Sequence, residues 1–93
     1  DFDDEALSAI ADLRQLDELN LGATIVSDES LETLLKFQEL TNLNVSGTLL
    51  EDDSFRALAK LPNLVHLDVS NTSIGFDVVD EIKEANPNLN LVE

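Results

Sequence analysis

The residue best suited to catalysis in this sequence is its only histidine, His66, which lies two residues before Asp68 and four before Ser70. These are the three side-chain types of a Ser-His-Asp triad, in which the histidine hydrogen-bonds to both partners. On one strand, however, residues i, i+2 and i+4 stand in a line about 7 Å apart. Because triad chemistry needs direct contact, the sequence predicts that His66 is a surface residue available for binding, and not a catalyst.

Two acidic stretches, DFDDE at residues 1–5 and EDDS at residues 51–54, contain the carboxylates of a potential metal site. A calcium loop needs ligands at alternating positions, a glycine bend and a distant bidentate glutamate, and neither stretch has that layout. The sequence also lacks cysteine, a zinc-ligand spacing, a phosphate-binding glycine loop and a nucleotide fingerprint. We therefore predict no enzyme activity, no metal ion and no cofactor.

The formal net charge of −15 restricts the partners of this 93-residue chain. Nucleic-acid affinity comes largely from cationic side chains on phosphates, so DNA and RNA are poor partners for it. Anionic membrane surfaces are disfavoured for the same reason, and no apolar run approaches the roughly 20 residues of a membrane span. Acidity of this kind fits either a basic protein partner or simple solubility. Nothing in the composition indicates a cellular compartment.

The apolar residues repeat with a period of 24 residues along the whole chain. Such a period, held in register, is the signature of a tandem array of structural units. The columns that share one position include Leu16, Leu40 and Leu64; Leu19, Leu43 and Leu67; Leu21, Val45 and Val69; Thr24, Thr48 and Thr72; and Phe2, Val26, Leu50 and Ile74.

Each unit contains a strand pattern, a turn and a helix pattern. The alternation Leu19/Leu21 and its equivalents predict a brief strand with apolar side chains on one face. Apolar residues three and four apart in residues 3–13, 27–37, 51–61 and 76–85 predict short helices. The acidic residues at each helix start are expected to cap free backbone N–H groups. The repeated threonine is expected to satisfy backbone groups where the chain leaves the strand, with its hydroxyls aligned as a ladder along the array.

The stretches LDELNLGAT (16–24), LTNLNVSGT (40–48) and LVHLDVSNT (64–72) resemble the leucine-rich repeat signature L-x-x-L-x-L-x-x-N/C, with threonine in the last position. This threonine variant is similar to short bacterial repeats of the planctomycete type. The resemblance implies an α/β fold: a right-handed solenoid with short parallel strands on its concave face and short helices on its convex face. It covers residues 2–92 and implies a single domain over residues 1–93, in which single units are stabilised by their neighbours.

The array is expected to comprise a helical half repeat at residues 2–13, repeats at about 14–37, 38–61 and 62–85, and a capping segment at 86–93. In that segment a one-residue slip aligns Leu89 with Leu64, so Leu89, Leu91 and Val92 are expected to form a last short strand. No strand precedes residues 16–21, which leaves one sheet edge open. Further repeats upstream, in a longer protein, or pairing with another chain would cover that edge.

The resemblance implies a protein-interaction module that binds a protein or peptide through its concave face. Strand alternation places a polar set of side chains there, without the Trp, Tyr and Arg that dominate binding hot spots. A self-associating structural spacer is the alternative, with part of an enzyme as a remote third. The predicted binding residues are Glu18, Asn20, Asn42, Asn44, Ser46, His66, Asp68 and Ser70.

Overall fold

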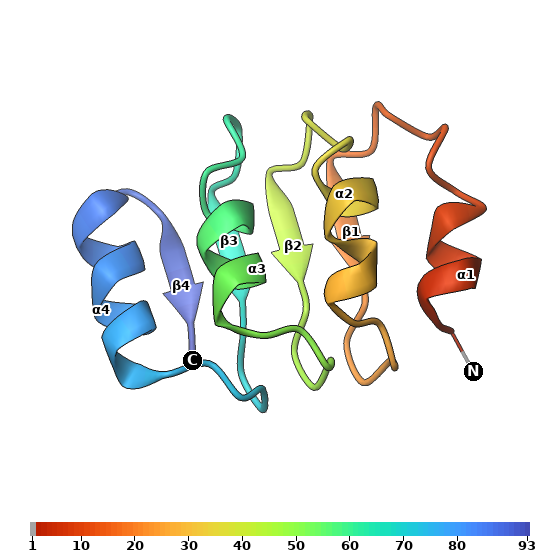
Figure 1. Ribbon diagram of the computed structural model, residues 1–93. Helices are drawn as coiled ribbons and strands as arrows, with labels where there is room; N and C mark the ends of the chain where they lie inside the picture. The colour runs from red at the N-terminus through yellow and green to blue at the C-terminus, as the bar shows by residue number, and fades with distance from the viewer. Residues whose placement is uncertain (1) are drawn as a thin grey trace.

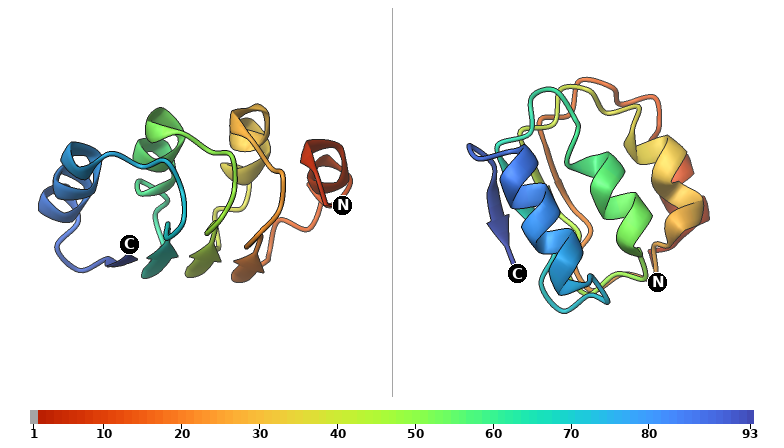
Figure 2. Two further views of the ribbon diagram at one scale, coloured as in Figure 1. Left: turned by 90° about the horizontal axis from the view of Figure 1, so that it is seen from below. Right: turned by 60° about the vertical axis from the view of Figure 1, so that its left-hand side comes forward.

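Four short parallel strands and the helices between them form two layers in the computed structural model, which describes residues 2–93 (Figure 1). The strands lie side by side in the order β1-β2-β3-β4, and all the helices lie on one side of them (Figure 2). The fold is therefore α/β, with an all-parallel sheet alternating with short helices, as predicted. The elements in chain order are α1 (Asp4–Ser8), β1 (Glu18–Asn20), the 3-10 turn η1 (Asp28–Ser30), α2 (Leu31–Leu34), β2 (Asn42–Asn44), α3 (Asp52–Leu58), β3 (His66–Asp68), α4 (Phe76–Ala85) and β4 (Asn90–Val92).

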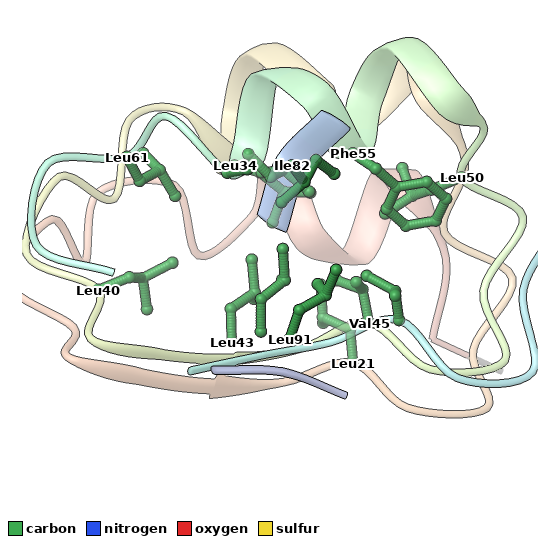
Figure 3. Close-up of a cluster of buried hydrophobic side chains, with 14 of the residues drawn as sticks. Leu21, Leu34, Leu40, Leu43, Val45, Leu50, Phe55, Leu61, Ile82 and Leu91 are labelled. Carbon is green, nitrogen blue, oxygen red and sulfur yellow. The ribbon is translucent and has the colours of Figure 1, made fainter. Parts of the chain in front are cut away.

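Neighbouring strands are offset by 24 residues, which is the period of the sequence. Leu19 is aligned with Leu43, Leu43 with Leu67, and Leu67 with Leu91. These leucines point towards the helix layer, as Figure 3 shows for Leu43 and Leu91, whereas the residues on either side of them point away from it. The predicted strand alternation is thus confirmed.

A core of aliphatic side chains fills the space between sheet and helices (Figure 3). Leucine and valine supply most of it, and Phe37 and Phe55 are its only fully buried aromatic residues. Burial of each such side chain contributes about 2 kcal/mol to the hydrophobic stabilisation. Because strand, turn and helix of each unit all contribute, neighbouring units share one continuous core.

The helices agree with the sequence pattern in position but differ in length. The pattern at residues 76–85 coincides with α4, whereas the helix expected over residues 2–13 ends at Ser8. Beyond Ser8 the chain continues in tight turns, in which Ile10 N–H donates to Leu7 O at 3.1 Å and Leu13 N–H to Ile10 O at 3.0 Å. Such i→i+3 turns advance about 2.0 Å per residue against 1.5 Å in an α-helix, so fewer residues carry the chain back to the sheet.

The repeated threonine closes the turn after β1, β2 and β3, as predicted. The hydroxyls of Thr24, Thr48 and Thr72 donate to the carbonyl three residues earlier, at 2.8, 2.8 and 2.6 Å. All three donate within their own unit, and no hydroxyl ladder links them in the described part of the chain. The residues just before them, Ala23, Gly47 and Asn71, all have a positive φ, of 59°, 64° and 55°. The turn therefore needs a left-handed residue at the same position in every unit.

The expected one-residue slip of the last unit is present in the turn before β4 but not in β4 itself. Leu89 N–H donates to Asn86 O at 3.0 Å, as Leu64 N–H does to Leu61 O at 3.3 Å, so the turn is displaced by one residue. The strand that follows returns to the 24-residue offset, with Leu91 and not Val92 aligned with Leu67. The slip cannot continue into β4, because a shift of one residue would turn Leu91 out of the core.

Candidate functional site

The sheet face that points away from the helices carries most of the residues predicted to bind. We call it the outer sheet face and define it by the outward residues of the four strands. Its first row crosses the strands as Glu18, Asn42, His66 and Asn90, and its second as Asn20, Asn44, Asp68 and Val92. A shallow hollow in this face is lined by Glu18, Leu19, Asn20, Asn42, Asn44 and His66.

The second row supports the turns that follow the strands. The Oδ1 atom of Asn20 accepts a hydrogen bond from Gly22 N–H at 2.8 Å, and that of Asn44 from Ser46 N–H at 2.9 Å. Asp68 Oδ1 does the same for Ser70 N–H at 3.0 Å and also accepts the Ser70 hydroxyl at 2.7 Å. These side chains are therefore fixed by the fold. For Asn20 and Asn44 the amide N–H₂ group is left to face a ligand, because the carbonyl oxygen is already used.

His66 makes its contact with the last strand and not with a catalytic partner. Its Nδ1 atom lies 2.8 Å from Asn90 Nδ2. Because an amide nitrogen only donates, Nδ1 is the acceptor, and the neutral ring carries its proton on Nε2. Asp68 is bonded to Ser70, so His66, Asp68 and Ser70 do not form a relay. Sequence reasoning missed Asn90 as a member of this row, although the unbroken 24-residue step from His66 predicts it.

Three aspartates at the helix starts link each unit to the next one. Asp4 accepts hydrogen bonds from Ser27 N–H at 2.8 Å, from the Ser27 hydroxyl at 2.7 Å, and from the Ser30 hydroxyl. Asp28 accepts from Glu51 N–H at 3.0 Å and from the Ser54 hydroxyl at 2.6 Å. These contacts span 23 and 26 residues, so they hold neighbouring units in register.

The third link is reduced, and the series ends at α4. Asp52 accepts only from Gly75 N–H, at 3.0 Å, because Val78 occupies the position of the serine. The next position in the series holds Phe76, which is 89% exposed. Of the acidic caps expected at each helix start, the described chain has the one at α1, where Asp3 accepts from Ala6 N–H at 2.9 Å. The expectation was wrong elsewhere, because Ser27 caps η1, and α3 and α4 have no side-chain cap. The 24-residue spacing of Asp4, Asp28 and Asp52 was the signal for the links between units.

Several acidic residues of the helix layer are engaged with protein groups, whereas others, such as Asp80 and Glu84, are exposed without such a contact in the described chain. The links above occupy three aspartates, and Arg56 pairs with Asp53 at 2.9 Å and with Glu81 at 3.1 Å. The Glu81 carboxylate raises the pKa of Arg56 above its usual value, with a further contribution from Asp53. Partial burial of the Asp4 carboxyl raises its pKa, but hydrogen bonds from Ser27 and Ser30 outweigh burial, and the pKa is lowered overall.

Two carboxylates at the start of β1 are unpaired in the part of the chain that the structure describes. Within residues 2–93, the carboxylates of Asp17 and Glu18 take part in no hydrogen bond or ion pair, and no lysine or arginine lines the hollow. A second hollow, in the helix layer, contains Asp28, Asp52 and Asp53 together with Arg56. No group of three or more metal-ligating residues has the geometry of a metal site in the described chain. The outer sheet face is therefore the better candidate for binding.

Comparison with protein-family models finds no match for this chain, and comparison with curated protein sequences finds none either. Among the helices of residues 2–93, none has the length and apolar character that a membrane span requires.

Proposed function

We propose that this chain is a leucine-rich-repeat binding module: a right-handed solenoid that holds a protein or peptide on its outer sheet face, which is the concave face of such a fold. The 24-residue offset of every strand pair and the threonine turn in each unit support this assignment. The repeats are assigned to residues 14–37, 38–61 and 62–85, preceded by a half repeat and followed by a capping segment.

The binding role depends chiefly on one observation, namely that fixed polar side chains surround a hollow on the outer sheet face. A non-catalytic role is supported by the engagement of the face with structural neighbours, namely of His66 with Asn90 and of Asp68 with Ser70. A ligand would meet amide donors and a carboxylate without encountering an activated nucleophile.

A face variant tests this proposal. Glu18→Gln, Asn42→Ala and His66→Ala are combined, since none of these side chains supports a turn, whereas alanine at Asn44 or Asp68 would remove a turn acceptor. Peptides selected from a random display library on the native chain should lose at least about tenfold in affinity for the variant.

The matched control carries three substitutions on the exposed side of α4, Asp80→Asn, Lys83→Ala and Glu84→Gln. Both variants must retain the native circular dichroism spectrum. The control is expected to bind the selected peptides with unchanged affinity. Selected peptides that bind the face variant as well as the native chain would assign binding to another surface.

Self-association is the second candidate function, because β1 lies at the end of the sheet and pairs only with β2. The backbone groups on its other edge are available to a strand of a second copy. Light scattering after size exclusion should then show a mass that grows with protein concentration. A constant monomer mass over micromolar concentrations would contradict this function.

A further inference from the structure

We propose, on the basis of the binding function above, that the occupant of the outer sheet face is an extended basic peptide segment, with lysine or arginine side chains that contact Glu18 and Asp68. The alternative explanation of the acidity, solubility alone, does not require cations to be kept off one face. All five lysine and arginine residues lie outside the four strands: Arg14, Lys36, Arg56, Lys60 and Lys83.

The carboxylates of the outer sheet face therefore have no cationic side chain beside them on the described part of that face. The ion pairs found within residues 2–93 all involve Arg56 of α3 or Lys83 of α4. On the sheet side, the Glu18 carboxylate borders the hollow without a partner among residues 2–93, and Asp17 lies beside it at the strand start in the same condition. A cationic ligand group would meet these carboxylates without displacing any contact of the fold.

The hydrogen-bonding pattern of the face favours a peptide over a simple cation. Between the two carboxylates lie the amide donors of Asn20 and Asn44, fixed by their bonds to Gly22 and Ser46. Donors in a row suit the carbonyl groups of an extended backbone. The remaining oxygen of Asp68, Oδ2, is available to a second cation, because its hydrogen bonds from Ser70 both go to Oδ1.

The spacing of the two carboxylates sets the spacing of the ligand's basic residues. Glu18 and Asp68 lie two strands and two residues apart in the aligned sheet, a separation of about 12 Å from standard strand dimensions. An extended peptide covers that distance in about four residues. Basic residues at i and i+4, or at i and i+2 with their long side chains spread, would therefore reach both carboxylates.

Fluorescence anisotropy with short labelled peptides tests this proposal. The probes are an alternating Lys-Ser peptide, and peptides of the same length in which glutamine or glutamate replaces lysine. The lysine peptide should bind at least about tenfold more tightly than the glutamine peptide, and its affinity should fall as NaCl is added. The glutamate peptide should not bind.

The variant Glu18→Gln/Asp68→Asn locates the binding. Asparagine at 68 retains the Oδ1 acceptor, as at Asn20 and Asn44, so the turn is preserved. This variant should weaken lysine-peptide binding about five- to tenfold, the sum of two exposed ion pairs. The control Asp80→Asn/Glu84→Gln removes the same charge from α4 and should change binding less than about twofold. If the double variant loses its native circular dichroism spectrum, Glu18→Gln alone carries the test.

Three outcomes would overturn the proposal. Equal weakening by both variants would mean diffuse attraction to the net charge. Equal affinity for the lysine and glutamine peptides, lost in the face variant of the preceding section, would leave the binding function intact but exclude a basic ligand. Dimers seen by light scattering and abolished by Glu18→Gln would assign the face to a second copy of the chain.

Discussion

Asp28 holds two units together through a single carboxylate oxygen, which accepts Glu51 N–H and the Ser54 hydroxyl. Ser54 is 2% exposed, so its hydroxyl would have no protein partner in Asp28→Ala. We expect this substitution to lower the free energy of unfolding by about 2 kcal/mol, the cost of leaving a buried polar group unpaired. Urea denaturation followed by circular dichroism measures it, since the chain contains no Trp or Tyr.

The neighbouring Glu29→Ala is the control, because it removes the same charge from an exposed side chain. Its effect should be less than about 0.5 kcal/mol. In Asp28→Ala/Ser54→Ala the second substitution should cost less than it does alone, since both remove one contact. Additive losses would show that the hydroxyl does not depend on Asp28.

Two substitutions at the left-handed turn position are expected to change the free energy of unfolding in opposite directions. Gly47→Ala places a Cβ atom at φ 64°, and should lower the free energy of unfolding by about 1 kcal/mol. Ala23→Gly removes a Cβ atom already held at φ 59°, and should raise it by up to about 1 kcal/mol. Urea denaturation of both variants measures the two changes. Changes of the same sign would mean that packing, and not backbone conformation, determines this position.

At the scale of the elements, the 24-residue periodicity predicted the features that depend on contacts within a single unit. The strand alternation of Leu43 and Val45, and the Thr48 turn, follow from side-chain type and spacing within 24 residues. The Asp28–Ser54 link did not follow, because acidic residues at a helix start predict capping of their own helix equally well. Which N–H group a carboxylate meets depends on how closely the units stack. That distance is a property of the packed core.

The link between α1 and η1 is expected to respond to acid. Hydrogen bonds from Ser27 and Ser30 lower the pKa of Asp4 in the folded state, whereas an unfolded aspartate has a pKa of about 3.9. The link therefore contributes its full stability above about pH 4, and loses it as pH falls through the folded-state pKa. The difference in unfolding free energy between the native chain and Asp4→Asn should be larger at about pH 6 than at about pH 2.5.

Asp80→Asn controls for the loss of one exposed charge from α4. Its difference from the native chain should change less between the two pH values than that of Asp4→Asn. A difference for Asp4→Asn that stayed constant with pH would show that the carboxylate contributes equally in its protonated form.

At the scale of the molecule, the sequence predicted which residues lie on the outer sheet face better than it predicted which of their polar groups are free to bind. The eight residues predicted to bind lie on the strands of that face or on the turns that follow them. Three of the four side chains of the second row, however, accept a hydrogen bond from a turn, as Asn44 does from Ser46. Asn90 lies on the outer sheet face because β4 returns to the 24-residue offset after the slip at Leu89. Both features depend on contacts between units, which a pattern within one unit does not contain.

The net charge of −15 should make stability depend on salt. The principal dimensions are 34 × 24 × 17 Å, so most carboxylates lie within a few screening lengths of one another at low ionic strength. Pairs with Arg56 and between Lys83 and Glu93 offset only a small part of the repulsion.

Raising NaCl from about 10 to about 200 mM shortens the screening length from about 30 Å to below 10 Å, and should raise the urea midpoint of unfolding. Asp80→Asn/Glu84→Gln should reduce the slope of the urea midpoint against salt concentration, and KCl should have the same effect as NaCl. A midpoint that fell as salt was added would mean that ion pairs, and not repulsion between carboxylates, dominate the salt dependence.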